Sequence, residues 1–141
     1  MKPDHLIKRL HHVGIAVKDI TSSTKEYSDI FGFKKESEVV LERNQKVYVQ
    51  FMVKDDIRIE LLQPSCKNSP ISNFIKKGGI INHLCYETDN LIMAMEHIKI
   101  NYNSIVVYGP DKSLSLSNCD YAFLAKPSGE VIELVSFGSS S

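Results

Sequence analysis

The chain of 141 residues is 43% hydrophobic and 24% charged, the composition of an ordinary globular domain with its own core. Seventeen basic and seventeen acidic side chains leave no formal net charge, so charge gives no argument for a nucleic-acid or membrane partner. No apolar run approaches the roughly 20 residues of a membrane helix, and the polar N-terminus lacks the apolar stretch of a secretory signal. We therefore expect a cytoplasmic protein. Its three separated cysteines predict neither a disulfide framework nor a structural zinc site.

The first half of the chain has the pattern of a strand, a helix and three more strands. Residues 10–17 are rich in β-branched side chains and predict a strand, and residues 18–33 predict a helix. Asp19 is a plausible cap for this helix, and Ser23 followed by Glu26 resembles a capping box. Three strands are then predicted at residues 33–42, 47–53 and 57–63.

A short helix at residues 69–77 separates this half from a second half of the same pattern. Ser69 is its expected cap, Pro70 suits its first turn, and Gly78 ends it. The order of elements then returns, with a strand at 81–90, a helix at 90–102 and strands at 104–109, 120–126 and 130–137. The serine-rich tail, residues 138–141, is expected to be disordered and without function.

Two histidines and two glutamates follow this repeat. His83 lies 71 residues after His12, and Glu133 lies 73 residues after Glu60, each glutamate in the middle of an Ile-Glu-Leu triplet. Offsets that agree within two residues at both ends of a repeated order of elements indicate an internal duplication. The four residues are therefore predicted to have equivalent roles in the two halves.

The two glutamates stand where a strand would ordinarily carry apolar side chains. Alternation along a strand puts Glu133 on a largely apolar face and Glu60 on a mixed one. A carboxylate removed from water needs a partner, and one divalent metal ion could serve both glutamates. Two imidazoles with two carboxylates suit zinc, nickel, cobalt, manganese or iron and leave positions open for a substrate, as in catalytic sites.

A purely structural role is the alternative for each of these residues alone. A single histidine in a strand is commonly a hydrogen-bonded core residue, and Arg58 beside Glu60 is consistent with a solvent-exposed row of salt bridges. Agreement of all four positions with the repeat favours the metal interpretation. Alternation and the alignment both select His12 over His11 as the first ligand.

The segments HHVGIAVKD, IELLQP, INHLCYETDN and AKPSGEVIEL resemble the vicinal oxygen chelate superfamily, which includes glyoxalases and bleomycin-resistance proteins. The resemblance implies an α+β fold of two tandem βαβββ modules that form a cupped mixed sheet. It covers residues 10–137 as a single domain, with modules at about 10–64 and 80–137 joined by the helix at 69–77. It also implies metal ligands at the same four positions: His12, Glu60, His83 and Glu133.

Within that superfamily the chain looks most like the epimerase branch, because ELLQP, the Ser-Pro-Ile helix and the glycine pair before INHL are shared features. The implied function is a metal-dependent epimerisation of a 2-substituted acyl thioester such as methylmalonyl-CoA, through a metal-stabilised enolate. Glu133 is the expected catalytic acid or base. The resemblance also implies a homodimer that acts on a small-molecule substrate.

Three further residues are expected to contact the substrate. Tyr48 and Gln50 share a face of one strand, and Cys85 shares a face with His83. Gln50 lies near where some epimerases have a glutamate, and a glutamine does not accept a proton at neutral pH, so the second acid or base remains unassigned. Residues 108–123 lack the glycine-rich stretch of epimerase relatives, which leaves recognition of coenzyme A open.

Two other functions remain on the same scaffold. A lyase of the glyoxalase I type would use the same ligand set on a hemithioacetal. A non-catalytic binding protein, similar to those that confer bleomycin resistance, would share the fold without the chemistry. A complete set of four metal ligands favours an enzyme, and a fourth protein ligand argues against a dioxygenase, which uses two histidines and one carboxylate.

Overall fold

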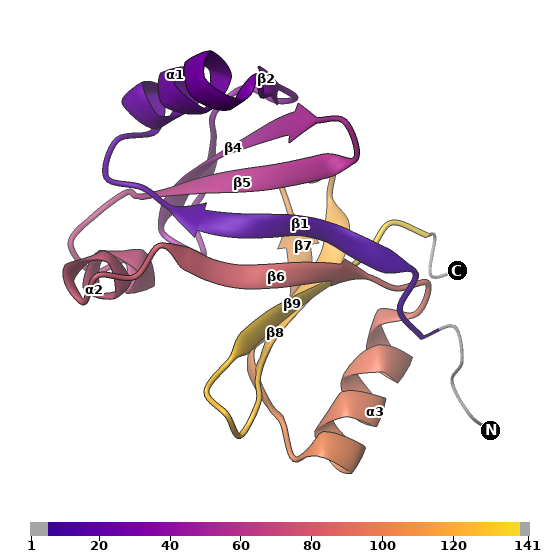
Figure 1. Cartoon of the computed structure of the whole chain (residues 1–141). Coiled ribbons are helices and arrows are strands. Elements are labelled where there is room, and N and C mark those ends of the chain that lie inside the picture. Colours follow the sequence, from indigo (N-terminus) through magenta and orange to yellow (C-terminus); the bar gives the residue numbers. More distant parts are fainter. Residues whose placement is uncertain (1–5, 139–141) are drawn as a thin grey trace. The chain divides into compact units, whose positions relative to one another are not determined.

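The computed structural model describes residues 6–138 and falls into two compact units, one of residues 12–82 and one of residues from 83 onward together with those up to 11. Figure 1 shows the elements in chain order. They are β1 (Arg9–Ala16), α1 (Ile20–Phe31), β2 (Lys34–Lys35), β3 (Val40–Glu42), β4 (Val47–Lys54), β5 (Ile57–Pro64), α2 (Pro70–Lys76), β6 (Ile81–Glu87), α3 (Leu91–Tyr102), β7 (Ile105–Ser113), β8 (Cys119–Ala125) and β9 (Val131–Ser136). The tail predicted to be disordered lies outside the described residues, apart from Gly138.

The first unit is a mixed sheet with a helix on one face. Its strands follow the order β2-β4-β5-β1, and β3 pairs with β4. β1 is parallel to β5, whereas β4 is antiparallel to β5. Helix α1 packs on β4 and β5 (Figure 1), over a cluster that includes Ile15, Ile20, Met52, Ile59 and Leu61. The opposite face of this sheet carries the polar residues described below.

Helix α1 begins one turn earlier than the capping box in the sequence suggests. The Asp19 side chain accepts hydrogen bonds from the backbone N–H groups of Thr21 and Ser22, so Asp19 is the cap and Ser23 lies within the helix. Gly32 ends the helix with φ of 77°, a left-handed conformation that a residue with a side chain adopts only with strain.

The strand predicted at residues 33–42 is two short strands, β2 and β3, both antiparallel to β4. Ser37, between them, forms hydrogen bonds with β4 in place of the regular backbone pairing of a strand. Its hydroxyl accepts a hydrogen bond from the Phe51 backbone N–H, and its carbonyl accepts one from the Gln50 side chain. Side-chain bonds of this kind compete with regular pairing, which explains the interruption.

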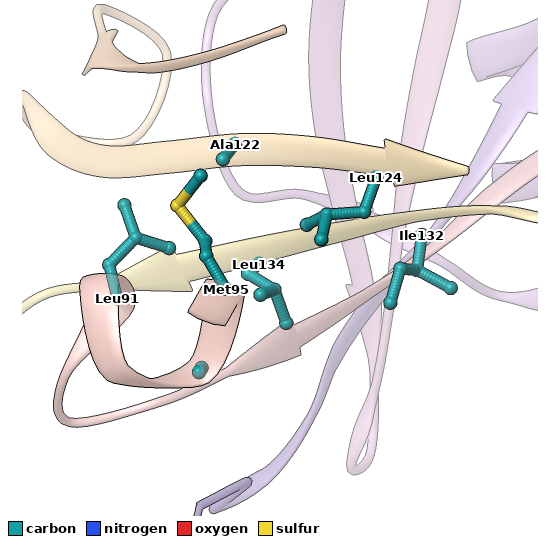
Figure 2. Close-up of a cluster of buried hydrophobic side chains, with 7 residues drawn as sticks. Leu91, Met95, Ala122, Leu124, Ile132 and Leu134 are labelled. Carbon is teal, nitrogen blue, oxygen red and sulfur yellow. The ribbon is translucent and has the colours of Figure 1, made fainter. Parts of the chain in front are cut away.

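The second unit repeats the plan. Its strands follow the order β6-β9-β8-β7, with β6 parallel to β9 and the other pairs antiparallel. Helix α3 packs against β8 and β9, and Figure 2 shows Leu91 and Met95 of the helix with Ala122, Leu124, Ile132 and Leu134 of the strands. β7 runs to Ser113, four residues past the prediction, because its irregular register with β8 hides the alternation of a strand.

These units confirm the predicted fold class, an α+β protein in which strand, helix and further strands occur twice in mixed sheets. The helix between the halves is also present, with Ser69 as its cap and Pro70 in its first turn. In residues 6–138 the longest helices have 12 residues, and none has the length and apolarity to cross a bilayer.

Candidate functional site

One imidazole–carboxylate pair lies in the first unit. β1 and β5 run parallel with Gly14 opposite Glu60, and His12, two residues before Gly14, shares their face. The Nε2 atom of His12 lies 3.2 Å from Oε1 of Glu60. Both side chains are buried, with 1% of His12 and 6% of Glu60 exposed. The pair is therefore held by the backbone pairing of two parallel strands and shielded from bulk water.

A second pair in the second unit has the same construction. β6 and β9 run parallel with Cys85 opposite Glu133, and His83 lies two residues before Cys85. The Nε2 atom of His83 lies 3.1 Å from Oε1 of Glu133, and both side chains are buried. Each unit thus brings together the histidine of its first strand and the glutamate of its last strand, as the repeat predicts.

A phenylalanine completes the equivalence of the two pairs. Phe51 is the antiparallel partner of Glu60, and Phe123 is the antiparallel partner of Glu133. Each ring meets the histidine of its own unit at a centroid distance of 5.2 Å, edge-on at 76° for Phe51 and 87° for Phe123. Such contacts restrict rotation of the imidazole, so each pair has an oriented ring nitrogen beside its carboxylate.

Each pair combines two kinds of group that can bind a metal ion. A buried carboxylate is costly unless it is matched by positive charge or hydrogen-bond donors. Imidazole nitrogen and carboxylate oxygen are both ligands of first-row transition metals, so each pair offers two ligand atoms.

Two residues predicted to contact the substrate lie on the other face of the first sheet. Gln50 is opposite Leu61 in the register of β4 and β5, one position away from the pairing of Phe51 with Glu60. Gln50 accepts a hydrogen bond from the Thr24 hydroxyl of α1 at 2.8 Å. Tyr48, on the same face, packs with the cluster beneath that helix. Tyr48 and Gln50 therefore lie on the face that the helix covers, which alternation alone does not reveal.

Cys85, the third such residue, shares a face with His83 and Glu133 but is fully buried. It packs in a cluster with Cys119, Tyr121 and Val135. Its position agrees with the predicted face, and its burial favours a role in packing beneath the pair.

A carboxylate that the sequence reasoning did not identify lies on the face of the first pair. Glu42 of β3 is opposite Val47 of β4, and Val47 shares its face of β4 with Phe51, the partner of Glu60. Only 8% of Glu42 is exposed. Glu42 shares a strand face with Val40, and this alternation could have identified it. However, residues 33–42 are predicted as one continuous strand with both apolar and charged side chains.

The fold and the two buried pairs can be compared with those of known protein families. Residues 11–123 match the model of the Glyoxalase/Bleomycin resistance protein/Dioxygenase superfamily. The chain belongs to that superfamily, which confirms the resemblance seen in the sequence motifs.

Its similar relatives include acyl-CoA epimerases. The chain is 34% identical over 99 residues to the ethylmalonyl-CoA/methylmalonyl-CoA epimerase of Cereibacter sphaeroides, covering 67% of this chain and 71% of the relative. It is 37% identical over 93 residues to the mitochondrial methylmalonyl-CoA epimerase of Mus musculus, covering 64% of this chain. The chain spans about half, 52%, of that mouse protein.

A solved structure extends the likeness of the fold over nearly the whole chain. The crystal structure of methylmalonyl-CoA epimerase from Mycobacterium tuberculosis superposes with a TM-score of 0.83, covering 96% of this chain and 92% of the other. At 24% identity this likeness is one of fold.

Proposed function

We propose that this protein is a metal-dependent epimerase of a 2-substituted acyl-CoA thioester such as methylmalonyl-CoA. The observation that carries the proposal is the repeated pair, a buried histidine and glutamate in the same register, with the same phenylalanine contact, in both units. The relatives named above act on this kind of substrate according to their names. Two such pairs in a single chain offer four ligand atoms, the number proposed for one metal centre.

The donor set suits a divalent transition metal. His12, Glu60, His83 and Glu133 together would supply two nitrogen and two carboxylate oxygen ligands, which leaves positions free on a five- or six-coordinate ion. Two negative charges from the carboxylates would offset the charge of the ion. A bound ion would supply Lewis-acid stabilisation of the negative charge that develops on the thioester oxygen when C2 loses its proton.

Epimerisation needs one group to remove the proton from C2 and another to return a proton to the opposite side of the planar carbon. We assign one role to Glu133, the residue expected from the sequence, and the other to Glu42. Glu42 shares the sheet face of Glu60 and lies, in register, four residues along β4 from the partner of Glu60.

The burial of the Glu42 and Glu133 carboxylates suits them to proton transfer. Glu42 and Glu133 are 8% and 5% exposed, so few water molecules compete for the proton that each would transfer. In the ionised form each accepts a proton from carbon, and in the protonated form each donates one. The two residues therefore exchange roles between the two epimers, as a reaction that runs in both directions requires.

The metal site is tested by the metal content of protein purified without chelator. Elemental mass spectrometry should find near one transition-metal ion per chain in the wild type and little in His83→Ala and Glu133→Ala. The matched control is His97→Ala, which removes a partly exposed imidazole on α3 and should keep the metal. A wild type that holds no metal and takes up no added cobalt, nickel or zinc would contradict the proposed centre.

The activity is tested by incubating metal-loaded protein with methylmalonyl-CoA in heavy water. Deuterium should enter C2, with loss of stereochemical purity in a substrate that starts as one epimer. Turnover of a hemithioacetal without exchange at C2 would instead assign a lyase of the glyoxalase type. Tight binding of the thioester without exchange would assign a binding protein on this fold.

A further inference from the structure

A surface pocket of the first unit lies outside the proposed catalytic centre. Its volume is about 420 Å³, and its lining includes Lys18, Pro64, Ser65, Cys66, Lys67 and Ser72. Two lysines and two serines line this concave surface together with the apolar Pro64 and Ile75, and the lining contains no carboxylate among the described residues. This chemistry favours an anionic ligand, because ammonium and hydroxyl groups both donate hydrogen bonds to phosphate oxygens.

The pocket lies at a defined distance from the proposed centre along the same strand. Pro64 is the last residue of β5 and shares a face with Glu60, since four residues separate them. At about 3.3 Å per residue the separation is roughly 13 Å. Lys18 lies two residues after the end of β1. This strand carries His12 and runs parallel to β5. Both strands therefore run from the first imidazole–carboxylate pair toward the pocket.

We infer that this pocket binds the phosphate groups of the substrate's coenzyme A moiety, with Lys18 and Lys67 as its cationic contacts. The inference rests on the proposed function and extends it to recognition of the substrate. The pantetheine arm between the thioester sulfur and the diphosphate has a backbone about as long as four extended residues, or roughly 14 Å. A thioester held beside Glu60 would therefore place the diphosphate at the pocket.

This assignment also accounts for a departure noted in the sequence. Residues 108–123 lack the glycine-rich stretch of epimerase relatives, and that absence left recognition of coenzyme A without an identified site. Lysines and serines at the ends of β1 and β5 provide the anion contacts from a different part of the chain.

The first test compares two substrates that differ only beyond the pantetheine arm. The double variant Lys18→Ala/Lys67→Ala should raise KM for methylmalonyl-CoA about tenfold and leave KM for methylmalonyl-pantetheine, which has no phosphate, unchanged. The matched control, Lys76→Ala/Lys77→Ala, removes the same charge from exposed lysines of the adjacent helix end and should change neither value. Equal effects on both substrates, or an equal effect of the control, would overturn the assignment.

The second test measures binding and does not depend on turnover. Cys66 is exposed at the pocket, whereas Cys85 and Cys119 are buried, so alkylation by iodoacetamide followed by peptide mass spectrometry reports on Cys66. Acetyl-CoA should slow alkylation of Cys66 in the wild type and not in Lys18→Ala/Lys67→Ala, and S-acetyl-pantetheine should protect neither. If the protein catalyses no exchange, this protection still supports the pocket. Exchange without such protection overturns the pocket and leaves the proposed function standing.

Discussion

Each proposed ligand is positioned by contacts that the neighbouring strands supply. His12 has Glu60 at 3.2 Å on one side and the edge of Phe51 on another, and the second unit repeats the arrangement around His83. The phenylalanines therefore do more than fill the core. They limit the orientations of the imidazoles toward the carboxylates.

Replacing Phe51 by alanine should therefore destabilise the folded protein. The side chain is 1% exposed, and its removal should lower the free energy of unfolding by about 3–5 kcal/mol, measured by urea denaturation. Phe31→Ala is the control, because its ring is 54% exposed and its loss should cost less than about 1 kcal/mol. Similar losses for both variants would show that Phe51 does not occupy a close-packed position.

The proposed proton-transfer role of Glu42 makes a separate prediction. Glu42→Gln keeps the shape of the side chain but cannot accept a proton, so deuterium exchange at C2 should fall by about 10²- to 10⁴-fold. Metal content should stay at the wild-type level, because Glu42 is not among the proposed ligands.

Glu38→Gln, at an exposed position of the same segment, should keep full exchange. If Glu42→Gln exchanged deuterium at the wild-type rate, Glu42 would be a structural carboxylate only.

At the scale of elements, local hydrogen bonds decided several boundaries. Ser37 separates β2 from β3 by bonding to the backbone and side chain of β4, which no pattern of apolar residues reveals. The start of α1 depends on whether the side chain of Asp19 or that of Ser23 accepts the first backbone hydrogen bonds of the helix. The structure selects Asp19, whose carboxylate accepts two backbone hydrogen bonds and also suits the positive end of the helix dipole.

Asp19→Ala should accordingly lower the free energy of unfolding by about 1 kcal/mol, measured in urea. Ser23→Ala should change it by less than about 0.5 kcal/mol, because Ser23 lies inside the helix, where alanine is a good helix former. The reverse order of these two effects would restore the capping box read from the sequence.

At the scale of the whole molecule, the proposed metal centre would link ion binding to folding stability. Metal binding to the folded state would then stabilise the protein by mass action, about 2.7 kcal/mol at a free metal concentration one hundred times Kd. Removing the metal with a chelator should lower Tm by several degrees, measured by calorimetry. His83→Ala should show the lower Tm with or without chelator. If the Tm of the wild type did not change with chelator, metal binding would not contribute to folding stability.

The predicted homodimer also belongs to this scale and stays a prediction. Several large apolar side chains are more than 60% exposed in the single chain, among them Ile80, Ile81, Ile100 and Ile105. Such side chains are common in interfaces between copies of a chain. Analytical ultracentrifugation would decide the state of association.

The sequence by itself determined the repeated order of elements and the equivalence of His12 with His83 and of Glu60 with Glu133, because periodicity and a shared offset survive without coordinates. Tertiary structure decided which face of each sheet the helix covers. It shows Gln50 on the face that packs against α1 and Glu42 on the same face as Glu60. The reason is physical. Alternation along a strand defines two faces, but only the register between strands and the packing of a helix on one of them decides which face is left for a ligand.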